Sequence, residues 1–257
     1  MSPSRERESA AGAPHPPLEK YYPGEAQRRA FVTALFDRTA RHYDGITRLM
    51  SLGSGSWYRR DALRRMGLAR GNVHLLDVAV GTGQVARAAR DILGETGRVT
   101  GVDLSMGMLS EARRHLACAL VQGVAEKLPF ADACADFVTM GYALRHVTDL
   151  ASTFREYLRV LKPGGTLLIL EMTRPPADTA AYRIMRFYLE SVVPRMARLG
   201  PGGAETRTLM EYCWDTVNEC VAPATIIETL AESGFSAPRR NVVLHVFSEY
   251  VATKPRD

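Results

Sequence analysis

The stretch Val73-His-Leu-Leu-Asp-Val-Ala-Val-Gly-Thr-Gly83 decides the fold of this chain. Its nearly continuous apolar run, residues 73–80, is typical of a strand that is covered on both faces of a parallel sheet. Gly81 and Gly83 then allow a sharp turn and a close approach of the backbone to a ligand. Helix-forming residues 84–92 follow, so the turn opens onto a helix N-terminus with free N–H groups. Because short glycine turns are common, this turn alone leaves a purely structural role open.

A second predicted strand, Arg98-Val-Thr-Gly-Val-Asp103, ends in a carboxylate. Asp103 lies 22 residues after Gly81, close to the spacing of about 20 residues at which an acidic side chain meets ribose hydroxyls in a nucleoside site. The alternative is a solvated aspartate at a strand end. The turn lacks a third glycine at the dinucleotide spacing, so it makes less provision for a pyrophosphate. These features favour S-adenosylmethionine (SAM) over NAD as the ligand.

Composition places the chain among ordinary globular proteins. Its 257 residues are 46% hydrophobic and 24% charged, which suits one domain with a full-sized core. No apolar run approaches the roughly 18–20 residues that span a bilayer, which excludes an integral membrane protein. The four cysteines show neither a Cys-x-x-Cys pair nor another metal-binding spacing. We therefore expect a cytoplasmic protein with reduced cysteines and no metal.

The charge of the chain indicates which binding partners, nucleic acid or an anionic membrane, are to be expected. The net charge is +5, and arginine far outnumbers lysine. The basic residues are spread along predicted helices without interleaved aromatics, so a nucleic-acid partner is not expected. Attraction to the anionic inner face of a membrane, as a peripheral association, stays open.

Strands and helices alternate along the middle of the chain, which predicts an α/β fold with a doubly wound parallel sheet and ligands at the carboxyl ends of its strands.

Residues 1–24 are polar and proline-rich, and we expect a disordered tail there. Residues 25–67 are predicted to form an N-terminal helical lid of two helices. Residues 68–257 are predicted to form the SAM-binding domain, with a helical insertion at about 180–212. Residues 181–199 of that insertion are amphipathic, which fits either a lid packed on the core or a membrane-facing entrance. The predicted strands are 73–80, 98–103, 119–121, 136–141, 166–171, 239–244 and 246–252.

Six segments resemble class I SAM-dependent methyltransferases and, within them, the ubiquinone/menaquinone biosynthesis C-methyltransferase family. The resemblance covers about residues 30 to 254. The first and fifth segments, 36–44 and 144–149, point most narrowly to the quinone branch. The resemblance implies a Rossmann-like, mostly parallel seven-stranded sheet with a final antiparallel strand, SAM as the cofactor, and a small aromatic or quinol acceptor. The six segments are 36–44, 76–83, 101–109, 125–130, 144–149 and 159–165.

The same resemblance implies roles for nine residues at the cofactor. The glycine turn, Gly81, Thr82 and Gly83, would hold the amino-acid part of SAM. The ribose would be held by Asp103. The adenine would lie between Leu104 and Met108, although Met108 also suits a core position. Its edge would be read by Val124 and Ala125, and Gly141 would border the cofactor. The family has Asp or Asn at position 124, so the valine here removes one hydrogen bond, at a cost of roughly 0.5–1.5 kcal/mol.

The predicted acceptor side departs from the family pattern. The family's Ser-Phe-Gly-Leu-Arg-Asn appears here as Gly141-Tyr-Ala-Leu-Arg-His146. Arg145 would stabilise a phenolate, His146 would accept its proton and give an acidic limb near pH 6–7, and Tyr142 would orient the ring. The alternatives are a salt bridge from Arg145 to Asp149 and an ordinary loop histidine. We expect C-methylation of an aromatic or quinol ring. O- or N-methylation, a non-enzymatic SAM-binding scaffold and a homodimer remain alternatives.

Overall fold

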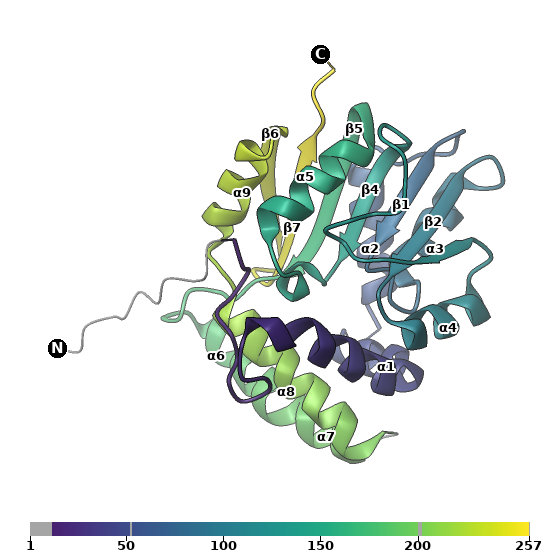
Figure 1. The fold of residues 1–257 in the computed structure, drawn as a ribbon. Helices are drawn as coiled ribbons and strands as arrows, with labels where there is room; N and C mark the ends of the chain where they lie inside the picture. The colour runs from purple at the N-terminus through teal and green to yellow at the C-terminus, as the bar shows by residue number, and fades with distance from the viewer. Residues whose placement is uncertain (1–11, 52, 200–201, 257) are drawn as a thin grey trace.

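The computed structural model describes residues 12–51, 53–199 and 202–256. Within these residues, seven strands form one sheet with the order β3-β2-β1-β4-β5-β7-β6 (Figure 1). Strands β1 to β5 run parallel to one another, whereas β7 runs antiparallel to both of its neighbours. The chain moves outward in opposite directions from β1 and β4, which makes their carboxyl ends the switch point where ligands bind. The doubly wound sheet with a final antiparallel strand is confirmed. The strands are β1 His74–Val78, β2 Arg98–Asp103, β3 Ala119–Gln122, β4 Ala135–Gly141, β5 Leu161–Met172, β6 Ser236–Val243 and β7 Phe247–Thr253.

Helices cover both faces of the sheet. On one face, α2 (Gly55–Arg65) and α3 (Gln84–Leu93) pack into a core that includes Leu75 and Val99. On the other face, α5 (Leu150–Val160) and α9 (Pro223–Glu232) bury an apolar stripe against β1, β4 and β5. This two-sided burial explains why β1 is buried at every position and why its sequence is largely apolar.

Residues 162–165, which precede the predicted strand 166–171, are part of β5. The pairing of β5 with β4 shifts from Ala135↔Leu161 to Phe137↔Thr166, so residues 162–165 form a bulge at the start of the strand. Gly164, with φ +79°, takes the left-handed conformation that this bulge needs. The bulge ends where the strand enters the core.

A separate helical layer lies beside the sheet (Figure 1). It consists of α1 (Glu25–Met50), α6 (Ala180–Arg186), the π-helical turn η2 (Phe187–Val192), α7 (Val193–Leu199) and α8 (Gly203–Glu219). Met185, Leu189 and Val193 are buried with α1 and α8 in one hydrophobic cluster, whereas Ile184 and Phe187 are exposed. Helix α4 (Met106–His115) packs against α1. In the described part of the chain, no helix combines the length and hydropathy that a bilayer crossing requires.

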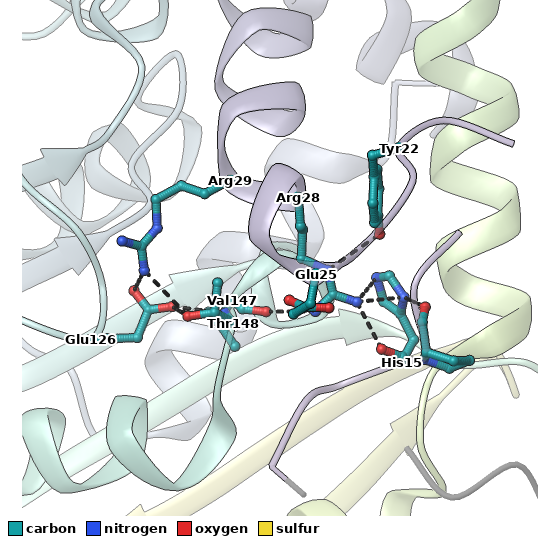
Figure 2. A network of polar contacts seen from close by, with 9 residues as sticks. His15, Tyr22, Glu25, Arg28, Arg29, Glu126, Val147 and Thr148 are labelled. Atoms are coloured by element: carbon teal, nitrogen blue, oxygen red, sulfur yellow. Dashed lines mark hydrogen bonds and ion pairs between the residues drawn. The ribbon is translucent and has the colours of Figure 1, made fainter. Parts of the chain in front are cut away.

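The expectation of a disordered tail is wrong for residues 12–24, while residues 1–11 lie outside the described part. Arg28 of α1 is fully buried and donates to the His15 carbonyl at 2.7 Å, to the Tyr22 hydroxyl at 3.2 Å and to the Val147 carbonyl at 3.3 Å (Figure 2). In the same segment, the Pro14 carbonyl accepts a hydrogen bond from the Val221 amide at 2.8 Å. Composition cannot reveal this order, because the polar groups of the segment find their partners in distant elements.

Candidate active site

A cavity of about 1120 Å³, including its open mouth, lies at the carboxyl ends of β1, β2 and β4. Its walls come from those strand ends, from the loops that follow β3 and β4, and from α1, which contributes Phe36 and Tyr43. Glu126, in the loop after β3, connects the loop after β4 with α1. It accepts hydrogen bonds from the amide and the hydroxyl of Thr148 at 2.7 and 2.6 Å and forms an ion pair with Arg29 of α1 at 3.7 Å (Figure 2). Helix α1 therefore closes one side of the cavity.

Asp103 is fixed at the end of β2 by the glycine turn. Its Oδ2 accepts from the Gly81 amide at 2.7 Å, and its Oδ1 accepts from the Ser105 amide at 2.8 Å. Burial raises the pKa of Asp103 to about 6, although hydrogen bonds from the Ser105, Gly81 and Leu104 amides oppose this shift. Each oxygen keeps a second lone-pair direction, so the carboxylate can still receive two hydroxyl groups.

Eight of the nine residues that we predict at the cofactor line the cavity. Gly83 is the exception: it is the N-cap of α3, with φ +87°, and a Cβ there would lie 3.0 Å from Leu116. Gly141 is required by packing, because a Cβ at the end of β4 would lie 2.8 Å from Val85 of α3. The eight lining residues are Gly81, Thr82, Asp103, Leu104, Met108, Val124, Ala125 and Gly141.

Asp77 also lines the cavity, and our sequence analysis misses it. This buried carboxylate on β1 accepts from the Thr139 hydroxyl at 2.7 Å through Oδ1, and the Ala86 amide in the first turn of α3 also interacts with it. Its Oδ2 is buried and has no hydrogen-bond partner of normal geometry among the described residues. Burial raises its pKa to about 7. An acidic residue within an otherwise apolar strand is the signal that could have revealed it, because such a group needs a functional or hydrogen-bonded partner.

Arg145 does not line the cavity, so the prediction that it stabilises a phenolate directly is wrong. Its guanidinium is buried, forms an ion pair with Glu171 of β5, and donates from Nε to the Thr216 hydroxyl at 3.1 Å. The alternative role, a salt bridge from Arg145 to Asp149, is also absent among the described residues, since Asp149 instead caps α5 by accepting from the Ser152 amide at 2.6 Å. Arg145 thus links β5 to α8.

His146 and Tyr142 do line the cavity. The His146 ring stacks on Tyr212 at 5.4 Å and meets Phe36 edge-on at 5.3 Å, and both ring nitrogens are buried without a partner among the described residues. Burial, reinforced by the charge of Arg145, lowers the pKa of His146 well below its usual value. Tyr142 has φ +61°, and the Arg59 guanidinium lies 5.7 Å from its ring centre.

The residues around the cavity fit SAM. An unpartnered carboxylate oxygen on Asp77 suits a cationic group, and the fixed carboxylate of Asp103 suits vicinal hydroxyls. The apolar side chains of Leu104 and Met108 offer surfaces for a purine between them. Fold and site together define the class I SAM-dependent methyltransferases.

Comparison with known proteins identifies the family. Residues 24–246 match the model of the ubiE/COQ5 methyltransferase family. The chain is 31% identical over 239 residues to a demethylmenaquinone methyltransferase of Desulfitobacterium hafniense, which covers 89% of this chain and 92% of the relative. It is 34% identical over 219 residues to a ubiquinone/menaquinone biosynthesis C-methyltransferase of Shewanella sediminis, covering 82% and 85%. The chain belongs to the ubiE/COQ5 methyltransferase family.

Solved structures agree on the fold. A putative SAM-dependent methyltransferase of Methanococcus maripaludis superposes with a TM-score of 0.61 at 19% identity, covering 86% of this chain and 95% of that one. A SAM-dependent methyltransferase of Aquifex aeolicus gives a TM-score of 0.57 at 18% identity, covering 76% and 89%. Family membership makes the protein a SAM-dependent methyltransferase and disfavours the scaffold alternative.

Proposed function

We propose that this enzyme methylates a ring carbon of a quinol or a similar hydroxylated aromatic. The observation that carries this proposal is the unpartnered, neutral imidazole of His146 in a cavity wall that also contains Phe36 and Tyr43. An aromatic acceptor suits those walls, and its hydroxyl suits a ring nitrogen that can accept a proton. The names of the relatives from Desulfitobacterium hafniense and Shewanella sediminis support the same acceptor class.

The chemistry follows from this arrangement. SAM supplies an electrophilic methyl group on a sulfonium. The acceptor hydroxyl loses its proton to His146, and the ring carbon next to it becomes nucleophilic. That carbon would form the new bond to the methyl group as the methyl–sulfur bond breaks. The same carbon would then lose its own proton to water, which restores the aromatic ring, and the ring oxygen would take its proton back from His146. The closed side formed by α1 aligns the acceptor and limits water.

The position of the transferred methyl group tests this proposal. The purified enzyme is given methyl-labelled SAM and a demethylated quinol, and the product is examined by mass spectrometry and NMR. We expect the label on a ring carbon. A label on oxygen or nitrogen would instead support the alternative motivated by the altered residues Tyr142 and His146. Complementation of a bacterial strain that lacks its quinone C-methyltransferase tests the quinol itself.

We propose that Asp103 holds the ribose of SAM and that the loop residues Val124 and Ala125 border the adenine. Replacing Asp103 with alanine is expected to weaken SAM binding at least tenfold, because two charge-assisted hydrogen bonds are lost. Isothermal titration calorimetry measures the change. Because Asp103 also orders the Gly81 amide, circular dichroism and the melting temperature should be recorded with it. Undiminished affinity in a folded variant would remove Asp103 from the site.

A further inference from the structure

Arg59 is a buried arginine with an unusual environment at the edge of the cofactor cavity. Its side chain belongs to the buried face of α2, and the residue is only 9% exposed. It lines both the cavity and a neighbouring groove, and Gln84 at the start of α3 lines both as well. Among the described residues, no carboxylate lies within ion-pair distance of its guanidinium, which packs instead against the Tyr142 ring.

This environment is costly without a ligand. An arginine side chain stays protonated at any accessible pH, so it cannot escape burial by losing its charge. A largely buried charge without an ion-pair partner is unfavourable even where its nitrogens still reach the cavity or the groove, and a contact with one aromatic ring compensates only part of that cost. The helix also makes room for the group: a Cβ at Gly55, one turn earlier, would lie 2.8 Å from Nη1 of Arg59. Arg59 is therefore prepared for an anion that the protein itself does not supply.

The second unpaired charge in the cavity has the opposite sign. Asp77 keeps one buried oxygen without a partner, and Arg59 lies close enough for its charge to lower the pKa of Asp77 in part. Both residues line the same cavity as the glycine turn and Gln84 at the start of α3. A basic and an acidic group on the wall of one cavity match a zwitterionic α-amino acid, the end group that SAM carries.

We propose that Arg59 is the counterion of the SAM carboxylate, with Asp77 on the side of its ammonium group. A quinol acceptor does not meet the need of Arg59, because its hydroxyls carry no permanent charge, whereas the amino-acid carboxylate is ionised throughout the physiological range. Arg59 thus selects the amino-acid end of the cofactor. This role is independent of which acceptor the enzyme methylates.

The test compares two ligands that differ only in the carboxylate. S-adenosylhomocysteine and its decarboxylated analogue are titrated calorimetrically into the full-length enzyme and into its Arg59→Met variant, without an acceptor. The variant is expected to bind S-adenosylhomocysteine roughly tenfold or more weakly, the scale of a charge-assisted contact, and to bind the decarboxylated analogue as the parent does. The parent is expected to prefer the carboxylate form, and Arg59→Lys to restore part of that preference.

Two variants serve as controls. Arg60→Met changes the next residue on the same helix, whose exposed guanidinium pairs with Asp91 at 2.6 Å, and it should leave both affinities unchanged. Asp77→Asn should weaken both ligands together, because both keep the ammonium group. Melting temperatures give a further readout: the ligand-free Arg59→Met variant should melt at or above the parent, since an unpaired buried charge is removed. Its stabilisation by S-adenosylhomocysteine should shrink.

Two results would overturn the proposal. An equal loss of affinity for both ligands, with a lower melting temperature of the ligand-free variant, would make Arg59 a structural residue. Unchanged affinity for S-adenosylhomocysteine with slower turnover would place its charge at the methyl acceptor instead. The affinities are measured without an acceptor, so a failure of this proposal differs from a failure to find methylation at a ring carbon.

Discussion

Replacing Glu171 with alanine is expected to lower the free energy of unfolding by about 3–5 kcal/mol, because the change leaves a buried charge without its partner. Glu171 is the penultimate residue of β5, an interior strand of the sheet, and forms an ion pair with Arg145; both side chains are at least 95% buried. The remaining side-chain contacts of Arg145 in the variant would be the Thr216 hydroxyl, at 3.1 Å from Nε, and the Cys213 sulfur. A hydroxyl carries no charge that could replace the carboxylate.

Urea denaturation at pH 7 measures this effect. Glu190→Ala is the matched control, because Glu190 pairs with Arg186 on the surface and its loss should cost less than about 1 kcal/mol. A double replacement, Arg145→Met with Glu171→Leu, should recover much of the stability lost in the single variant, since apolar side chains can replace a buried pair. A loss below about 1 kcal/mol in Glu171→Ala would show that Arg145 reaches water and is not held as a buried ion.

The fold and the cofactor side could be predicted from the sequence because their signals are local. Residues 73–80 predict a strand that the structure places at His74–Val78, and the glycine turn and Asp103 are joined by a spacing that any βαβ unit must respect. Each of these inferences needs only one segment and its nearest neighbour. The two-sided burial of the sheet then makes apolar runs reliable markers of its strands.

The acceptor side could not be predicted in the same way, because adjacent residues there face opposite directions. The short 3₁₀ turn Leu144–His146 sends Arg145 toward Glu171 and α8, while His146 faces the cavity. The sequence places both residues at the end of the fourth strand and cannot distinguish these directions. Arg59 shows the same limit, since an arginine on a helix normally indicates a solvated face, and only the tertiary structure shows that this one is buried.

His146→Asn is expected to lower kcat by roughly 10²-fold, the scale expected for the loss of a general base, and to leave SAM affinity nearly unchanged. Asparagine keeps a similar size and polarity but has no basic nitrogen. The structure also corrects the expected pH dependence. Because the pKa of His146 is held well below 6.5, its acidic limb in the rate profile should fall well below pH 6.5, lower than the limb near pH 6–7 that an ordinary histidine would give.

Single-turnover rates between pH 4.5 and 8, within the stability range of the protein, test this prediction. The control is His115→Asn, an exposed site at the end of α4.

The folded state resists protonation of His146, whereas the unfolded chain binds that proton once the pH falls below about 6.5. This residue should therefore make the parent lose stability as the pH falls from 7 to 5, and the asparagine variant should lose less. Near-normal rates and an unchanged profile in His146→Asn would show that the ring only packs between Phe36 and Tyr212. The acceptor proton would then have to leave through water, since Arg145 is occupied by Glu171 outside the cavity.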